Sequence, residues 1–595
     1  MLRSLRNVCV MLVMVYGLTV MPLAAQDLRP IDVVPATAVL YLEISDPVAV
    51  MASVIDHAVM KQITGLDVFR RATETPEFYR AIAARKFFEL QMGMEWRAAV
   101  EAIGQKGVYF AVDGKTRGNI FLVRGRDEQI MQDVRLKLLE LTRLGGDQIR
   151  KLETYRDIPV YRLEKFGFAV VRDWLVVSNN SEAGKLLLDR LLDLSAADGE
   201  SLSGVKSFGE ASAARSAEPG VWSWVHLENL RALGLAEGLF AERTENPLAE
   251  LLFGGIQSVL RKAQWVSTEL QMTAQGLNLK TSMPFAADWI PESRQWYFGQ
   301  DAQGRVPAVP EVPETLMTLQ AYRGVSEMWL RAGDLFDEQT NDRMAEAESN
   351  LGTIFGGRDF GEEVLGAFSP AMQLLVARQD FSEVRPAPAI RLPAFALILT
   401  MDDPETMRPE LRRTFQSAIG FFNIVGAQQG QPQLEMDIQK SDVMDVITSH
   451  YVAQKKDQAN PAAPVIYNFS PTAVFFGDQF VLSSSESLAR TIAEARRLPQ
   501  EDAHTAVAVE GMPLRAVLND NREQLISQNM LQKGQTHDEA EAEFQVILQL
   551  MEYLQNAKLR LVPSESQLTL EAAVQLQATG ATEDGSAARG NSDGQ

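Results

Sequence analysis

The chain has 595 residues, of which 46% are apolar and 23% are charged, so it is long enough for more than one domain with a sizeable buried core. Its formal net charge is −21, and such an acidic surface repels phosphate backbones, which argues against a nucleic-acid partner. Its one cysteine, Cys9, lies near the N-terminus, so disulfides, thiol nucleophiles and cysteine-ligated metals are excluded from the rest of the chain.

The N-terminal residues have the order of a secretory signal. Arg3 and Arg6 precede an apolar run from Val8 to Ala25, which ends in Pro22 and small residues. A positive end, an apolar core and small residues predict a signal peptide over 1–26 and an exported protein, periplasmic or extracellular. The alternative is an uncleaved membrane anchor, because the run approaches the roughly 18 residues that span a bilayer. No transmembrane segment is expected after cleavage.

The remaining sequence shows one order of elements twice. The strand-like VVPATAVLYLEI, from Val33, has a counterpart in EVPETLMTLQAY, from Glu311. Two pairs of residues align them: Pro35 with Pro313, and Thr37 with Thr315. The match predicts related units.

A hairpin also recurs: FAVVRDWLVVSNNSE, from Phe168, and TAVFFGDQFVLSSSE, from Thr472. Each predicts a strand, a two-residue turn ending in Asp173 or Asp478, a second strand and a helix start. The predicted caps are Asn179 with Glu182 and Ser483 with Glu486. The distance from turn to cap then differs by one residue, which a strand end tolerates and a catalytic pair does not. We therefore interpret the repeat as architecture.

Both copies end alike. Helices are predicted to begin at Asn246–Pro247 and at Thr536, where Glu539 completes a capping box. The strands that follow, near 277–283 and 568–576, alternate apolar and polar residues, which indicates sheets with one buried and one wet face.

These signals predict an α+β fold of two related units, each a mainly antiparallel sheet with helices packed on one face. The units would cover 27–300 and 301–578, joined by a Gly- and Pro-rich linker that starts near Gly299. Residues 579–595 are predicted to be a disordered tail, and a surface loop is expected near 453–464.

Two aromatic stretches are candidates for a binding surface. On the strand-like VWSWVHLEN, Trp222, Trp224 and His226 share one face, which fits either a groove or a partly buried sheet. DWIPESRQWYFGQD stands before the linker, and its aromatic residues would either contact a sugar, lipid or partner or hold the two units together. They are Trp289, Trp296, Tyr297 and Phe298.

No motif for catalysis, cofactor binding or metal binding appears. The phosphate-loop pattern fails at Tyr109, where a glycine is required before DGKT. The five histidines lack metal-ligand spacing, and no G-x-S-x-G or EF-hand sequence occurs. We therefore assign no catalytic, cofactor or metal residues.

The chain resembles a family of exported bacterial proteins of the planctomycete type that is defined by a domain of unknown function. The resemblance is carried by VVPATAVLYLEI after a signal, by FAVVRDWLVVSNNSE and by its repeat TAVFFGDQFVLSSSE. The resemblance implies an envelope location and a non-enzymatic role, and it implies no cofactor or catalytic residue.

The hypothesis is thus an exported, non-catalytic binding or scaffold protein of the bacterial cell envelope, whose partner is an envelope protein, a glycan or a lipid. One alternative is an exported hydrolase with active-site residues from distant loops, which requires paired carboxylates or a Ser–His pair in a pocket. The other is a carrier of apolar ligands between sheet and helices, which requires an empty apolar cavity in place of a filled core.

Overall fold

A computed structural model of the chain describes residues 28–578, except 67–68, 70–78, 80–81, 84, 87–88, 91–92, 146–149, 164, 194–199, 219, 383–385 and 454–462. The predicted signal peptide and tail, and most of the loop expected near 453–464, lie outside the described residues.

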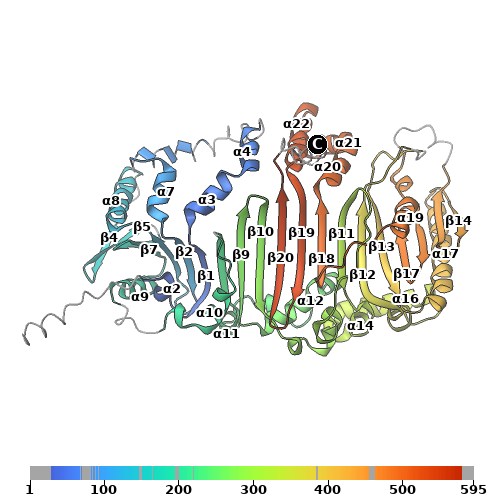
Figure 1. Cartoon of the computed structure of the whole chain (residues 1–595), viewed down its shortest axis with the longest axis horizontal. Helices are drawn as coiled ribbons and strands as arrows, with labels where there is room; N and C mark the ends of the chain where they lie inside the picture. Colours follow the sequence, from blue (N-terminus) through green and yellow to red (C-terminus); the bar gives the residue numbers. More distant parts are fainter. Residues whose placement is uncertain are drawn as a thin grey trace, which may run out of the picture.

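In the described residues, twenty strands form one antiparallel sheet that runs the length of the molecule (Figure 1). The first ten are β1 Ala38–Ile44, β2 Val108–Asp113, β3 Asn119–Arg124, β4 Arg150–Tyr155, β5 Ile158–Leu163, β6 Phe166–Val171, β7 Trp174–Ser178, β8 Val221–His226, β9 Trp265–Thr273 and β10 Gly276–Pro284. The second ten are β11 Thr315–Tyr322, β12 Phe368–Ala377, β13 Ala394–Met401, β14 Leu434–Lys440, β15 Asp445–Tyr451, β16 Thr472–Phe476, β17 Gln479–Ser483, β18 Thr505–Glu510, β19 Leu554–Pro563 and β20 Gln567–Leu576.

The strand order is the same in both halves of the sheet. From one edge it runs β4-β5-β6-β7-β3-β2-β1-β8-β9-β10. From the other edge it runs β14-β15-β16-β17-β13-β12-β11-β18-β19-β20, and β10 pairs with β20 in the middle. Adding ten to each strand number converts the first order into the second, which supports the prediction of two related units.

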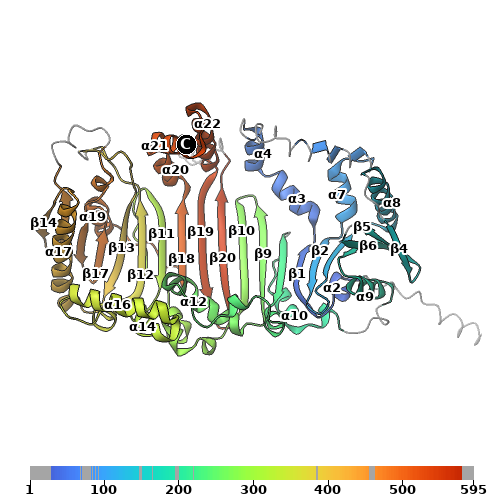
Figure 2. The ribbon, with the colours of Figure 1, turned by 180° about the vertical axis from the view of Figure 1, so that it is seen from behind.

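Helices line both ends of the strands (Figures 1 and 2). Those of the first half are α2 Pro30–Val33, α3 Pro47–Ile55, α4 Ala58–Gly65, α7 Trp96–Gly104, α8 Glu128–Gly145, α9 Ser181–Leu192, α10 Lys206–Ala213, α11 Leu227–Ala232, α12 Pro247–Lys262 and α13 Gln295–Phe298. Those of the second half are α14 Val325–Leu330, α15 Ala332–Leu335, α16 Glu338–Ile354, α17 Pro404–Gln428, α19 Glu486–Glu494, α20 Gly511–Asp520, α21 Arg522–Lys533 and α22 His537–Met551.

The α+β class and the antiparallel sheet are confirmed, but the helices do not lie on one face. In the second half, Leu488 and Ile492 of α19 pack on Val481. Phe415 of α17 packs on Phe480, the neighbour of Val481 in the same strand. Because neighbouring residues of a strand point to opposite faces, α19 and α17 cover opposite faces of the sheet.

The repeated hairpin ends in the same hydrogen-bonded corner in both halves. The hydroxyl of Ser178 accepts the N–H of Asn180 (3.1 Å) and donates to its carbonyl oxygen (3.0 Å). Ser483 makes the same two bonds to Ser485, at 3.1 and 2.9 Å.

The helix caps are therefore placed differently from the sequence prediction. Asn180 and Ser485 are the N-cap residues of α9 and α19, in place of the predicted Asn179 and Ser483. Each cap follows the aspartate of its turn by the same number of residues, so the predicted difference of one residue is wrong. The starts of α12, capped by Asn246, and of α22, with its Thr536 capping box, are as predicted.

Candidate functional site

The first aromatic candidates are buried in the core of the first half. Trp222, Trp224 and His226 do lie on one face of β8. The ring of Phe208, from α10, covers this face, with its centroid 5.5 Å from Trp222 and 5.3 Å from Trp224. Burial lowers the pKa of His226. These side chains fill the core and are not accessible as a binding surface.

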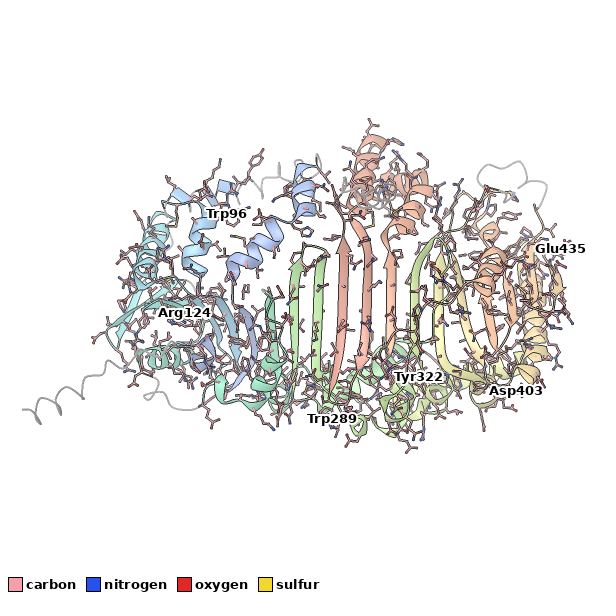
Figure 3. All side chains as sticks on the ribbon, in the orientation of Figure 1. Trp96, Arg124, Trp289, Tyr322, Asp403 and Glu435 are labelled. Atoms are coloured by element: carbon pink, nitrogen blue, oxygen red, sulfur yellow. The ribbon has the colours of Figure 1, made fainter. Side chains whose placement is uncertain are left out.

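The second aromatic group lies where the two halves meet. Trp296, Tyr297 and Phe298 are buried in a cluster that contains Val259 of the first half and Leu561 of the second. The Tyr297 hydroxyl donates to the carbonyl oxygen of Leu252 (2.6 Å). Trp289, placed at the lower rim of the sheet in Figure 3, is partly buried against the same cluster. The group joins the halves and leaves no exposed aromatic surface for a sugar.

A buried polar cluster, which the sequence did not reveal, adjoins these rings. His504 is fully buried, and its Nε2 donates to the carbonyl oxygen of Tyr297 (2.6 Å). The guanidinium of Arg323 lies 3.7 Å from the centre of the Tyr297 ring and donates to the carbonyl of Leu251 (2.7 Å). Burial, and then the nearby Arg323, hold the pKa of His504 well below its ordinary value. Both side chains are almost fully buried, which favours a structural role, although Arg323 also lines the cavity beside α14.

The aspartates of the repeated turns also have structural roles. Asp173 accepts hydrogen bonds from Lys106 and Arg124, both at 3.0 Å. Burial alone would raise the pKa of Asp173, but these two cations hold it below its ordinary value. Asp478 is exposed beside Gln479, to which it is hydrogen-bonded. Neither carboxylate lies in a cavity opposite a reactive group.

The hydrolase alternative required paired carboxylates or a Ser–His pair in a pocket. Two cavities contain several carboxylates: Glu292, Glu327 and Glu362 in one, and Glu314, Asp380 and Glu486 in the other. No group of three or more His, Cys, Asp or Glu residues in the part of the chain that the structure describes is arranged to hold a metal. The cavity of about 820 Å³ beside α14 contains Glu292 in its wall, but this carboxylate is largely exposed and paired with Arg331. A second cavity, of about 760 Å³, lies at the start of α19 and includes Glu486, which is paired with Arg490. Ion-paired, solvated carboxylates are poor general acids.

The most extensive candidate surface is a row of aliphatic side chains that crosses fourteen strands. Each member lies directly opposite the next in the sheet register. In spatial order they are Leu175, Val123, Val108, Ile44, Val221, Leu270, Leu279, Ala572, Leu559, Val507, Leu319, Leu374, Leu397 and Leu482. At about 4.8 Å per strand, the row is roughly 60 Å long.

A second apolar row runs beside the first, two residues along the strands. Its members are Met272, Leu277, Val574, Ala557, Val509, Met317, Val376 and Phe395. None of them is fully buried, and the side chains of Leu270, Leu277, Leu482 and Phe395, from the two rows, are 37–49% exposed. We call the two rows together the central apolar face.

In the central strands β10, β20 and β19 the other side of the sheet is polar. Between the apolar positions of β10 and β20, Lys280 lies opposite Glu571, and Glu571 lies opposite Arg560 of β19. The Arg560 guanidinium is 3.4 Å from the Glu571 carboxylate. The sequence alternation was therefore correctly interpreted as two unlike faces, but the apolar face is not buried here.

Helices cover the margins of the central apolar face and leave its middle open. Val259 of α12 packs on Met283, Leu561 and Leu568 at one end of the central strands. At one end of the sheet, α17 packs on Ala473, which continues the first row beyond Leu482. Helix α3 contacts β9, and no helix crosses the middle of β10, β20, β19 or β18 in either view (Figures 1 and 2). The 820 Å³ cavity opens beside this face, since Met372, Leu397 and Leu399 line it.

The apolar-carrier alternative required an empty cavity between sheet and helices, whereas the central apolar face is an open surface. Sequence reasoning missed this surface, because its members lie far apart along the chain and meet only through strand pairing. In the described residues, no helix combines the length and the apolarity needed to cross a bilayer.

Comparison with known proteins identifies no family and no function for this chain. No family model matches the chain, and neither does any curated protein, so the family resemblance stays a prediction. Among solved structures, crystal forms IV and III of TP0453 match with TM-scores of 0.26 and 0.24, both at 13% identity. The matches cover 43% of this chain and 81% and 79% of those chains. These values are too low to support an inference about function.

Proposed function

We propose that the chain is an exported, non-catalytic binding protein of a bacterial cell envelope, and that the central apolar face binds the hydrocarbon chains of lipids. The observation that carries the proposal is the first row, in which fourteen successive strands present an aliphatic side chain and most of these remain partly exposed. Soluble monomeric proteins rarely expose contiguous apolar patches larger than a few hundred Å², and larger patches mark interaction sites. The predicted signal peptide supports the envelope location.

The chemistry of the two rows favours hydrocarbon over protein. Neither row contains a side-chain hydrogen-bond donor or acceptor other than the weak sulfur acceptors of Met272 and Met317. The backbone groups of these strands already pair within the sheet. A protein interface of standard size carries about ten hydrogen bonds, for which this surface offers no partners. A hydrocarbon chain needs none.

The dimensions also suit lipid chains. Half of a bilayer's hydrocarbon core is about 15 Å thick, so a row of roughly 60 Å is several acyl-chain lengths long. Adjacent rows are separated by two residues of a strand, or about 7 Å, which is enough for chains to lie side by side. Contact with a preformed apolar surface contributes roughly 25 cal/mol per Å² removed from water.

The test compares two adjacent residues of β10. Leu279→Glu places a carboxylate in the middle of the first row, and Asn278→Glu makes the same neutral-to-acidic change on the opposite, exposed face. We expect the wild-type protein to bind a fluorescent fatty acid and to release lipid on solvent extraction. We expect Leu279→Glu to weaken fatty-acid binding by tenfold or more, because the carboxylate would have to lose its water against the hydrocarbon of the ligand. We expect Asn278→Glu to bind like the wild type.

Three outcomes would contradict the proposal. The wild-type protein does not bind the probe, or the two variants bind equally well. In the third, sedimentation shows a dimer that only Leu279→Glu dissociates, which would assign the face to a second copy of the chain. Melting temperatures within a few degrees of wild type confirm that both variants are folded.

A further inference from the structure

Helix α17 has a second apolar surface besides the one that packs on the sheet. Its buried residues recur every four positions, at Met407, Leu411, Phe415 and Ile419, and contact the sheet. In its last two turns three of the exposed residues are large and apolar. Phe421, Phe422 and Ile424 have 61%, 53% and 64% of their surface exposed. We call these three residues the α17 tip.

The α17 tip lies in a stretch without charge. From Thr414 to Leu434 the sequence contains no Asp, Glu, Lys or Arg. At the chain's average of 23% charged residues, a stretch of this length would contain about five. The rings of Phe421 and Phe422 are 6.2 Å apart and form one patch. An uncharged surface with two aromatic rings is the composition that enters the interfacial layer of a membrane.

The tip is too small to be a stable protein–protein interface. Three side chains exposed by half to two thirds offer on the order of 300 Å², whereas a stable protein–protein interface takes about 800 Å² from each partner. A bilayer imposes no such minimum, because each inserted side chain contributes independently by its buried apolar area.

The tip is anchored at one end of the molecule. Asn423 exchanges two hydrogen bonds with Leu434, of 2.9 and 2.7 Å, which fix the end of α17 to the first residue of β14. Figure 3 shows Asp403, the N-cap of α17, and Glu435, the second residue of β14, at the same end of the long axis. Figure 1 shows β14 as the outermost strand at this end.

We propose that the α17 tip inserts into the surface of a lipid bilayer and docks the chain there. The inference rests on the proposed function, because lipids bound on the central apolar face must be taken from or delivered to a membrane. The geometry favours this site for transfer, because α17 packs on the sheet where the first row passes under it at Ala473.

Electrostatics gives the docking a distinctive salt dependence. The chain carries a net charge of −21, so an anionic bilayer repels it as a whole. Insertion of the uncharged tip gains nothing from Coulomb attraction. Salt screens the repulsion, so binding to anionic vesicles is expected to rise with ionic strength, opposite to binding through basic residues.

Vesicle flotation tests the inference on the exported chain without residues 1–26, because the apolar run from Val8 to Ala25 would itself bind vesicles. The vesicles are phosphatidylcholine with or without phosphatidylglycerol. We expect the wild-type protein to float with the vesicles and Phe421→Ser/Phe422→Ser to lose at least nine tenths of this binding. The matched control is Phe253→Ser on α12, a phenylalanine of similar exposure at 59%, which should float like the wild type. Wild-type binding should rise or stay constant between low and high salt.

A label reports the depth of insertion. Because the one cysteine, Cys9, lies in the predicted signal peptide, the exported chain with Phe421→Cys or Phe253→Cys carries a single environment-sensitive dye. We expect vesicles to shift the emission to the blue at position 421 only. Absence of flotation by the wild type, equal flotation of the double serine variant, or a dimer in sedimentation that this variant abolishes would overturn the inference.

The two proposals fail separately. Leu279→Glu should still float with vesicles while it loses fatty-acid binding, and Phe421→Ser/Phe422→Ser should still bind fatty acid while it loses flotation. If the tip variant loses fatty-acid binding as well, the tip belongs to the ligand site and the assignment of a separate docking surface is wrong.

Discussion

Lys280 of β10 lies directly opposite Glu571 of β20, at the centre of the ladder that joins the two halves of the sheet. Three residues away on either side, Leu277 faces Val574 and Met283 faces Leu568. The register therefore places the apolar residues of both halves on the same side. A shift by one residue would turn Glu571 to the apolar side and interrupt the central apolar face, because side chains alternate along a strand.

The serine corner predicts matched effects in the two halves. Ser178 and Ser483 are both buried, and each hydroxyl makes the same two bonds to the cap residue of the following helix. Replacing either serine with alanine leaves buried backbone groups without these partners, so we expect each variant to lose about 1–3 kcal/mol of unfolding free energy. Urea denaturation measures both values.

The matched control is Ser485→Ala, since the Ser485 side chain makes no capping hydrogen bond. We expect a smaller loss of unfolding free energy than at Ser178 or Ser483, because no capping bond is removed. A large loss for one corner serine and none for the other would show that the corners differ in energy, and would count against a common origin of the halves.

The aromatic group at the junction predicts that a buried and an exposed phenylalanine differ in their contribution to the free energy of unfolding. Phe298 is buried between the halves, in contact with Phe285 at 5.4 Å between ring centres. Phe298→Ala creates a cavity there, and we expect it to lower the unfolding free energy by about 3–5 kcal/mol. Phe253→Ala removes an exposed ring and should change it by about 0.5 kcal/mol or less. Equal effects would show that the ring of Phe298 contributes nothing to joining the halves.

Local sequence signals predicted local structure well. The alternation near 277–283, the start of α12 at Asn246–Pro247 and the capping box at Thr536 are all present in the structure. Alignment of the two halves by Pro and Thr was less accurate. Ala38 and Thr315 each open their strand just before a bulge, so the ladders make them equivalent. Matching Thr37 to Thr315 is thus one residue out of register.

Tertiary features were not predictable in the same way. Leu279 meets Ala572 and, through it, Leu559, although these residues lie almost 300 positions from Leu279 in the sequence. Alternation shows that each strand has an apolar side, but only strand pairing joins these sides into one surface, and only the placement of helices decides whether it is covered. Arg323 gave no signal either, because its partners are backbone carbonyls, the Tyr297 ring and the side chains of His504 and Thr505, most of them distant along the chain.

A buried ion pair fixes the segment before the linker. Arg294 donates to both carboxylate oxygens of Glu250, at 2.6 and 2.9 Å, and both side chains are almost fully buried. Glu250→Gln keeps the shape but leaves a buried cation without its counter-ion, and we expect a loss of about 3–5 kcal/mol in unfolding free energy. Glu311→Gln breaks the solvent-exposed pair with Arg496 and should cost about 0–1 kcal/mol. Similar losses of unfolding free energy for the two variants would contradict the expectation that the buried ion pair contributes more to stability than the exposed one.

His504 predicts how stability depends on pH. Its Nε2 donates to the Tyr297 carbonyl, so the proton taken up on charging must go to Nδ1, which faces Arg323 at 3.4 Å. Burial, and then this cation, keep the pKa of His504 well below that of the unfolded chain. Between the two pKa values the unfolded state holds the additional proton, so acidification favours unfolding.

The loss begins as the pH falls through about 6.5, the ordinary pKa of histidine, and amounts to about 1.4 kcal/mol per pH unit for each such group until the folded protein itself is protonated. His226, whose pKa burial also lowers, adds to the slope. Above about pH 7.5 neither state is protonated at these sites and the full stability is present. His504→Gln, compared with the exposed His450→Gln, should reduce the difference in unfolding free energy between pH 7.5 and 5.5, whatever its effect at either pH. An unchanged difference would show that His504 is protonated equally in both states, which its buried contacts with Tyr297 and Arg323 oppose.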